Sequence, residues 1–158
     1  MRLTFEALPS DLVSALRAGA PDANGQPAER GAISDGDGVP CRHCLHDTPA
    51  GQDYLILAHR PFPAPQPYAE TGPIFLCAGD CPRWEGEGVP PILTTSPDYL
   101  LKGYSTDHRI VYGTGKVVAT GEIEAYADGL LSYPRVAFVD VRSARNNCFH
   151  VRIRRGGE

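Results

Sequence analysis

The stretch RVAFVDVRSARNNCFHVRIR, residues 135–154, contains the two clearest strand patterns in the chain. From Phe149 onward, apolar residues alternate with His150 and with arginines, which is the period of a strand with one buried face. A Ser-Ala-Arg-Asn-Asn segment separates this strand from the one before it, over residues 135–142, and is typical of a turn. The end of the chain therefore predicts an antiparallel hairpin whose arginine-bearing face points to solvent.

Other short apolar runs occupy residues 53–59, 72–78, 99–104 and 109–112. The first two could bring the cysteine pairs together if they pair with each other, and the last two are expected to form a hairpin. Helical signals are limited to a short segment after Ser10, which we expect to be its N-cap, and to a mixed segment over residues 117–127. Since turns rather than helices join the strands, the predicted fold class is α+β, with a largely antiparallel sheet, one or two short helices and long Pro/Gly-rich loops.

The length of 158 residues favours a single domain, over residues 1–158. Residues 1–38 are expected to form an N-terminal helix and loop, and residues 39–154 the core of the domain. A chain of this size buries about 68–70% of its unfolded surface, so it needs no disulfide or metal merely to fold.

Four of the five cysteines form two tight pairs, Cys41 with Cys44 and Cys77 with Cys81. Both gaps suit a short loop that offers two thiolates to a tetrahedral zinc ion. Because 32 residues separate the pairs, the fold must bring them together. A site with four thiolates has no open position for water, so these four residues are predicted to be the ligands of a structural zinc. Three nearby cationic side chains, Arg42, His43 and Arg83, could offset the negative charge of such a site.

The same cysteines leave other interpretations open, namely a catalytic metal, ordinary packed thiols or a redox dithiol. The redox interpretation depends on Cys41 and Cys44, because the cations between them would lower a thiol pKa. A thioredoxin-like pair opens a helix, whereas Pro49 and Gly51 follow here too soon for one. The sequence does not decide whether the protein is an enzyme. If it is a thiol oxidoreductase, the active site would centre on Cys41, His43 and Cys44.

The charge is uneven along the chain. The net charge is −4, but residues 135–158 carry six arginines against two carboxylates, a local +4. The overall charge argues against a dedicated nucleic-acid binder, although the basic end could hold an anion. The candidate anion-binding residues are Arg142, Arg145, Arg152 and Arg154; the alternative is a solvated strand face. A small anionic ligand or a protein are the partners that remain open.

The N-terminal residues lack the continuous apolar stretch of a secretory signal, and no run approaches the ~20 apolar residues of a membrane span. We therefore expect a cytoplasmic protein with no membrane partner. In that compartment thiols stay reduced, and paired cysteines are more often metal ligands or redox groups than disulfides.

Four strings of sequence carry a family resemblance: PCRHCL at 40–45, YAETGPIF at 68–75, RIVYGTG at 109–115 and VRSARNNCFHVRI at 141–153. With these strings the chain resembles a bacterial family, domain-of-unknown-function family 1203. The resemblance implies no established activity, substrate or partner. Relatives tend to carry histidine where this chain has Cys77, and these two side chains interchange readily as zinc ligands. The resemblance thus implies that residue 77 belongs to a ligand set with Cys41, Cys44 and Cys81.

Overall fold

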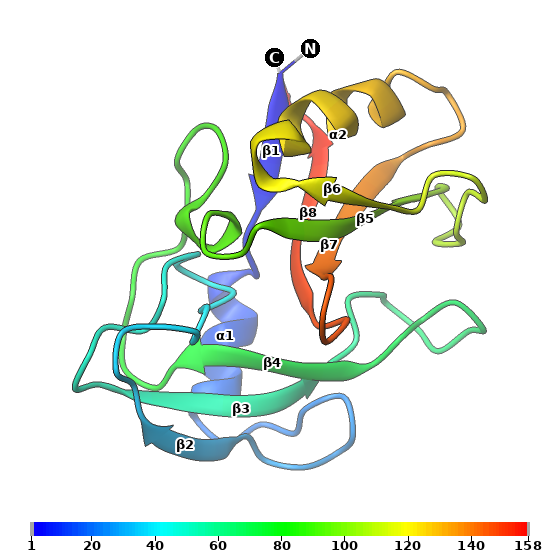
Figure 1. Ribbon diagram of the computed structural model, residues 1–158. Helices are drawn as coiled ribbons and strands as arrows, with labels where there is room; N and C mark the ends of the chain where they lie inside the picture. The colour runs from blue at the N-terminus through cyan, green and yellow to red at the C-terminus, as the bar shows by residue number, and fades with distance from the viewer. Residues whose placement is uncertain (1, 158) are drawn as a thin grey trace.

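A computed structural model describes residues 2–157, which form two antiparallel sheets and two short α-helices (Figure 1). The larger sheet has the strand order β1-β8-β7-β5-β6, and the smaller has the order β2-β3-β4. The strands are β1 (Leu3–Glu6), β2 (Glu29–Ile33), β3 (Asp53–His59), β4 (Gly72–Cys77), β5 (Asp98–Tyr104), β6 (Lys116–Ala119), β7 (Phe138–Ser143) and β8 (Phe149–Arg155). The helices are α1 (Ser10–Arg17) and α2 (Ile123–Leu131), with single 3₁₀ turns at Pro91–Leu93 and Thr120–Glu122. The predicted α+β class is confirmed.

The predicted C-terminal hairpin is present as β7 and β8. Its register changes at a bulge, where Val141 pairs with Val151 but Arg142 pairs with Phe149. The expectation that its polar face is solvated is wrong for His150, which is only 9% exposed, and for Arg152, whose side chain is only 11% exposed, whereas the side chain of Arg154 is 40% exposed. Alternation in a strand distinguishes two faces but does not show whether a second layer covers the polar one.

The hairpin expected after residue 104 is present only as a short connection, because residues 109–112 do not form a strand. They make an antiparallel bridge between Tyr104 and Ile110, and the N–H of Val111 donates to the carbonyl of Gly103 over 2.9 Å, while β5 pairs with β6. The backbone N–H of Gly103 donates to the hydroxyl of Thr114 over 2.9 Å, so a side chain takes the place of a neighbouring strand there. The mixed segment over residues 117–127 resolves into the end of β6 followed by α2.

The N-terminal segment differs from expectation in two respects. Strand β1 precedes the helix and pairs with β8, so the two ends of the described chain lie side by side at the top of Figure 1. The N-cap of α1 is Pro9 rather than Ser10. The Ser10 hydroxyl instead makes a hydrogen bond with a ring nitrogen of His43.

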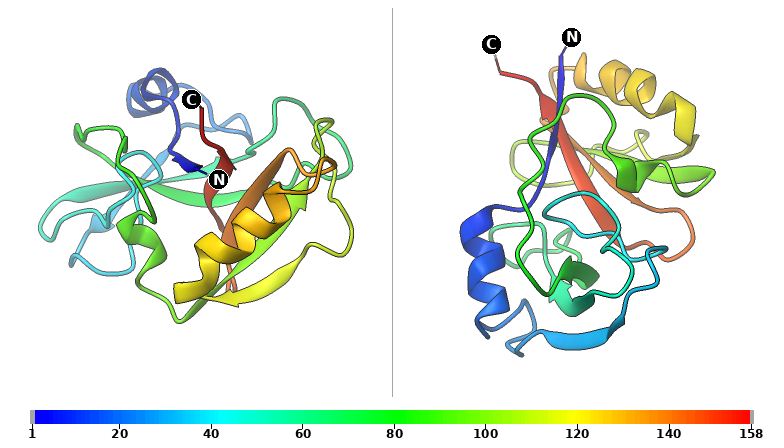
Figure 2. Two further views of the ribbon diagram at one scale, coloured as in Figure 1. Left: turned by 90° about the horizontal axis from the view of Figure 1, so that it is seen from above. Right: turned by 90° about the vertical axis from the view of Figure 1, so that its left-hand side faces the viewer.

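Each sheet packs against one helix and has its own apolar core. Helix α2 covers one face of the larger sheet, where it buries residues such as Leu131 against Val139 and Val151. Helix α1 lies beside the smaller sheet and buries Val13 and Leu16 with the cysteine pairs (Figure 2, right). Within the described residues, no helix has the length and apolar character needed to cross a membrane.

Candidate metal centre and a buried charged face

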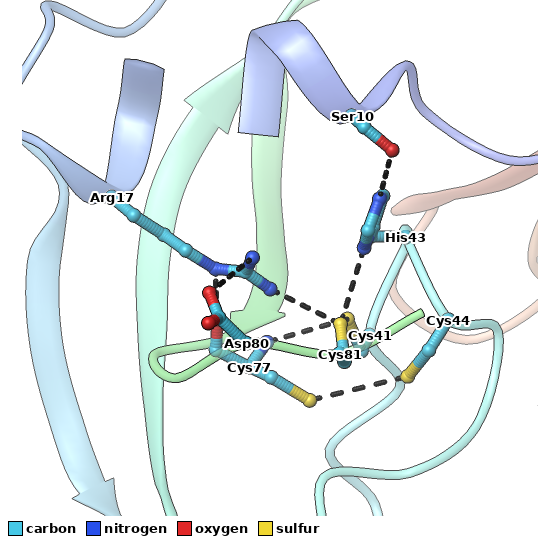
Figure 3. A network of polar contacts seen from close by, with 8 residues as sticks. All are labelled: Ser10, Arg17, Cys41, His43, Cys44, Cys77, Asp80 and Cys81. Atoms are coloured by element: carbon cyan, nitrogen blue, oxygen red, sulfur yellow. Dashed lines mark hydrogen bonds and ion pairs between the residues drawn. The ribbon is translucent and has the colours of Figure 1, made fainter. Parts of the chain in front are cut away.

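The first cysteine pair occupies a tight turn. The backbone N–H of Leu45 donates to the carbonyl of Cys41 over 2.9 Å, and the N–H of Cys41 donates to His46 over 3.0 Å. Leu45 adopts a left-handed conformation with φ of 56°, which an L-residue adopts at a cost. This turn directs the Cys41 and Cys44 side chains to the same side (Figure 3).

The smaller sheet positions the second cysteine pair, Cys77 and Cys81. Strands β3 and β4 pair with each other, with Tyr54 opposite Cys77, and Cys77 is the last residue of β4. The turn that contains Cys41 lies along the same strand, because the N–H of Arg42 donates to the carbonyl of Phe75 over 3.2 Å. The sheet therefore brings together two pairs that are far apart in sequence.

The four sulfur atoms form a compact group. All lie within 4.8 Å of one another; the Sγ atoms of Cys41 and Cys81 are 3.9 Å apart, and those of Cys44 and Cys77 are 4.0 Å apart. Four thiolates at about 2.3 Å from a zinc ion have sulfur–sulfur separations of about 3.8 Å in a tetrahedron. A disulfide would need about 2.05 Å, and all five cysteines are free. The four cysteines are therefore placed so that they could hold one metal ion.

Hydrogen-bond donors surround these sulfur atoms (Figure 3). The Arg17 guanidinium lies 3.1 Å from Cys81 Sγ, and a ring nitrogen of His43 lies 3.2 Å from the same atom. The backbone N–H of Cys77 donates to Cys41 Sγ over 3.3 Å, and the Thr48 hydroxyl lies 3.4 Å from Cys77 Sγ. Donors directed at sulfur stabilise thiolates rather than thiols.

His43 is oriented from both sides. Its Nε2 atom is 2.9 Å from the hydroxyl of Ser10, at the start of α1, and its Nδ1 atom faces Cys81. Burial lowers the pKa of His43, so the ring is neutral at pH 7 and carries one N–H. With that hydrogen on Nδ1, the ring donates to sulfur and accepts from the Ser10 hydroxyl.

The charge balance of the cluster depends on a residue that the sequence does not point to. Arg17 contacts Cys81 Sγ, donates to the carbonyl of Cys77 over 3.0 Å and lies 3.9 Å from Asp80. It is 24 positions before Cys41, and only the packing of α1 brings it there. Among the three cations expected nearby, His43 contacts a sulfur atom, whereas Arg83 binds main-chain carbonyls before α1 and Arg42 extends away.

In the metal-free cluster the four thiols are not equivalent. Hydrogen bonds from Cys44, and then from Cys77 and Cys81, lower the pKa of Cys41. The contact with Cys41 raises the pKa of Cys44 in turn. Cys41 is also the most buried of the four, at 0% exposure.

The four candidate anion-binding arginines have different surroundings. Arg145, in the β7–β8 turn, lies 2.6 Å from Asp98 and is half exposed, and Arg154 lies 3.1 Å from Glu6. Arg152 binds Asp140 through two parallel hydrogen bonds of 2.7 and 3.0 Å. Arg142 is the most buried of the four, at 4% exposure. Arg142, Arg152 and Arg154 share the face of the larger sheet that α2 does not cover, while Arg145 lies in the turn.

That face continues into a buried group of polar residues that we call the charged face. It consists of Arg42, His59, Lys102, Tyr104, Asp140, Arg142 and Arg152. Its members come from the first cysteine turn and from β3, β5, β7 and β8. Only Arg142 and Arg152 among these residues were predicted from the sequence to bind an anion, because no motif connects the others.

Both regions lie within a segment that is shared with other proteins. The profile of the family described as protein of unknown function (DUF1203) matches residues 38–155, which is most of the chain. The chain belongs to this family. The DUF1203 segment contains the four clustered cysteines and the whole charged face. Comparison with curated proteins and with solved structures found no match.

Proposed function

We propose that Cys41, Cys44, Cys77 and Cys81 bind one zinc ion as a structural site, and that the protein acts by binding rather than by catalysis. The observation that carries the proposal is the geometry of the sulfur atoms, whose separations of 3.9 and 4.0 Å agree with the edges of a zinc–thiolate tetrahedron. Soft thiolate ligands in this geometry select zinc or iron, and zinc suits a site with no redox role.

The chemistry of four thiolates supports a structural role. They satisfy all four positions of a tetrahedral ion, so no site remains for a water molecule or a substrate. The ion and its ligands together carry two negative charges, of which Arg17 would offset one through its contact with Cys81. A site of this kind stabilises the fold and performs no reaction itself.

The proposed ion would join three separate parts of the domain. The first cysteine turn and the end of β4 supply the ligands, and Arg17 and Ser10 connect α1 to them. The N-terminal helix and the core would thus fold as one domain over residues 1–158. Reduced thiolates suit a reducing compartment, so the proposal includes the bacterial cytoplasm as the location.

A thiol-based oxidoreductase that uses Cys41 and Cys44 is the second candidate. The lowered pKa of Cys41 favours it, because a thiolate is the attacking species in disulfide exchange. Two features weigh against it. The Cys41 side chain is fully buried, and no helix begins at the pair. A redox thiol must reach its partner, so the zinc site accounts better for the burial.

Elemental analysis combined with thiol counting separates the two candidates. On protein purified without a histidine tag, the proposal predicts one zinc per chain, four thiols that react only after a chelator is added, and one thiol, Cys148, that reacts at once. It also predicts that the chelator unfolds the protein and that zinc restores it. Metal-free protein that stays folded and forms a Cys41–Cys44 disulfide would contradict the proposal and support the oxidoreductase.

A further inference from the structure

Arg142 is buried with half of its guanidinium unused. Its Nη1 atom donates to the carbonyl of Asn147 over 2.9 Å and lies 3.3 Å from a Glu70 carboxylate oxygen. Its Nε and Nη2 atoms are buried and have no hydrogen-bond partner among the described residues. Buried N–H groups of a charged side chain are rarely left without an acceptor, because the loss of their hydration is costly.

On the neighbouring strand β8, Arg152 shows what the Nε and Nη2 atoms of an arginine bind in the same environment. Arg152 uses its Nε and Nη2 atoms to hold both carboxylate oxygens of Asp140, at 2.7 and 3.0 Å. These are the same two atoms that are unpartnered in Arg142. The two N–H groups form a fork whose spacing matches a carboxylate or a phosphate group.

A further donor lies on the adjacent strand. Tyr104, on β5, is fully buried, and its hydroxyl has no hydrogen-bond partner among the described residues. Burial and the charge of Asp140 raise its pKa to about 12, against the charge and the closeness of the Arg142 guanidinium, so the hydroxyl keeps its proton at pH 7. Three donor atoms without an acceptor, Nε and Nη2 of Arg142 and the Tyr104 hydroxyl oxygen, therefore lie in one buried region, and an anion is the species that accepts from all of them.

The region also carries a net positive charge, which favours an anionic ligand. Five cations, Arg42, Arg60, Lys102, Arg142 and Arg152, are accompanied by three carboxylates, those of Asp47, Glu70 and Asp140. Burial lowers the pKa of Arg42 to about 10, which still leaves it charged at pH 7.

The histidines do not alter this balance. Burial and the charges of Arg42, Arg152, Arg142 and Arg60 lower the pKa of His59 to about 4, and burial together with Arg42 lowers that of His150 to about 3. Both are therefore neutral at pH 7. The region as a whole carries a surplus of two positive charges.

We propose that the Nε–Nη2 fork of Arg142, with the Tyr104 hydroxyl beside it, binds the oxyanion group of a small ligand, a carboxylate or a phosphate, between the two sheets. This inference deepens the proposed binding role by naming the class of ligand. A surface cavity of about 250 Å³ opens beside the charged face and is lined in part by His59 and Arg152, whereas Arg142 and Tyr104 lie behind its lining. Glu70, which contacts Arg142 and Lys102 at 3.3 Å each, has a side chain that is 39% exposed.

The test is a titration of the full-length, zinc-loaded protein with inorganic phosphate and, separately, with malonate. Chloride is exchanged to keep the ionic strength constant, and binding is followed by calorimetry and by the melting temperature. We expect one of the two oxyanions to bind saturably and to raise the melting temperature, and the stronger response identifies the source as phosphate or carboxylate. Equal responses to phosphate, malonate and chloride would overturn the inference.

Two variants assign the site. Arg142→Lys keeps the charge but removes the fork, and we expect it to weaken binding by about ten- to a hundredfold, the range of one or two charge-assisted hydrogen bonds. The matched control is Arg145→Lys, since Arg145 is exposed and already paired with Asp98, and it should bind as the wild type does. Unchanged affinity in Arg142→Lys would contradict the inference.

Tyr104→Phe gives a readout that a merely structural role would not produce. Removal of a buried hydroxyl without a partner should leave the ligand-free protein as stable as the wild type, while binding of the oxyanion weakens severalfold. If Arg142→Lys does not fold, NMR of the arginine Nε–H groups in the wild type replaces it, and a shift of the Arg142 signal on titration is expected. An unmoved Arg142 signal would overturn the inference. Zinc content is measured on every sample, so an error about the metal is distinguishable from an error about the ligand.

Discussion

The cysteine cluster and the charged face are two regions of surplus charge with opposite signs. In the cluster, Arg17, His43 and a backbone N–H direct donors at sulfur atoms that become thiolates. In the charged face, Arg142 and Tyr104 carry buried donors that no acceptor meets among the described residues. The difference agrees with the two ligands that we propose, a cation at the cluster and an anion at the charged face, because buried polar groups without a protein partner indicate the sign of the ligand that they suit.

Arg42 connects the two regions. It lies between Cys41 and His43 in sequence, but its guanidinium donates to the carbonyl of Phe149 over 2.8 Å, at the start of β8. From there its charge lowers the pKa of His59 and of His150. A metal that fixes the first cysteine turn would also fix Arg42, so the charged face should respond to the loss of the metal.

Replacement of a ligand cysteine should have the largest effect. Cys→Ser at position 41, 44, 77 or 81 removes a thiolate, and we expect loss of zinc and destabilisation by at least about 5 kcal/mol, since metal binding and folding are coupled. Cys148→Ser is the control, because Cys148 lies outside the cluster, and it should change stability by less than about 0.5 kcal/mol. Urea unfolding with zinc analysis measures both. A single ligand position that tolerates serine with full zinc content would break the assignment.

On the charged face, Asp140→Asn should have the next largest effect. Asp140 is fully buried and is the carboxylate that Arg152 holds through two hydrogen bonds, so its loss leaves buried cations uncompensated. We expect destabilisation by about 3–5 kcal/mol with zinc content unchanged. Asp98→Asn breaks the exposed pair with Arg145 and should cost less than about 1 kcal/mol. Equal costs in the two variants would show that the charged face is solvated after all.

A smaller effect is expected from Arg17→Gln, which removes the cation beside Cys81 but keeps all four ligands. Loss of a hydrogen bond to a metal ligand lowers affinity by about ten- to a hundredfold, and we expect a change of that size in a competition titration with a zinc chelator. Arg30→Gln, which breaks an exposed pair with Asp53, is the control. Equal zinc affinity in the two variants would remove Arg17 from the site.

His59, on the charged face, and His150, on β8, are both neutral at pH 7. Their lowered pKa values predict that the stability of the protein depends on pH. Their pKa values of about 4 and about 3 lie below the usual ~6.5, so unfolding takes up protons at mildly acidic pH. The unfolded state binds protons below about pH 6.5, whereas the folded state resists them. The free energy of unfolding is therefore highest above about pH 6.5 and decreases as the pH falls toward 4, by up to about 1.4 kcal/mol per pH unit for each histidine.

His59→Gln tests this dependence. It should flatten the slope of the unfolding free energy between pH 6.5 and 5 relative to the wild type, at equal zinc content. An identical slope in the variant and the wild type would contradict the assignment to His59.

The cysteine ligand set could be proposed from sequence because each pair is local, and because the apolar runs over residues 53–59 and 72–78 indicated the β3–β4 pairing that unites them. Arg17 could not be predicted, since its position depends on how α1 packs against the smaller sheet. The arginine-bearing face of β8 was predicted to be exposed to solvent for a related reason. The alternation in β8 distinguishes two faces, but the burial of Arg152 and Arg142 depends on the layers that cover them.

The central claim is that four cysteine thiolates hold one zinc ion with no open position. Zinc K-edge X-ray absorption on the purified, untagged protein tests it most directly. We predict a single shell of four sulfur atoms at about 2.3 Å, unchanged when phosphate or malonate is added. A shell that contains nitrogen or oxygen, or protein that folds and binds oxyanions with no zinc, would contradict the claim.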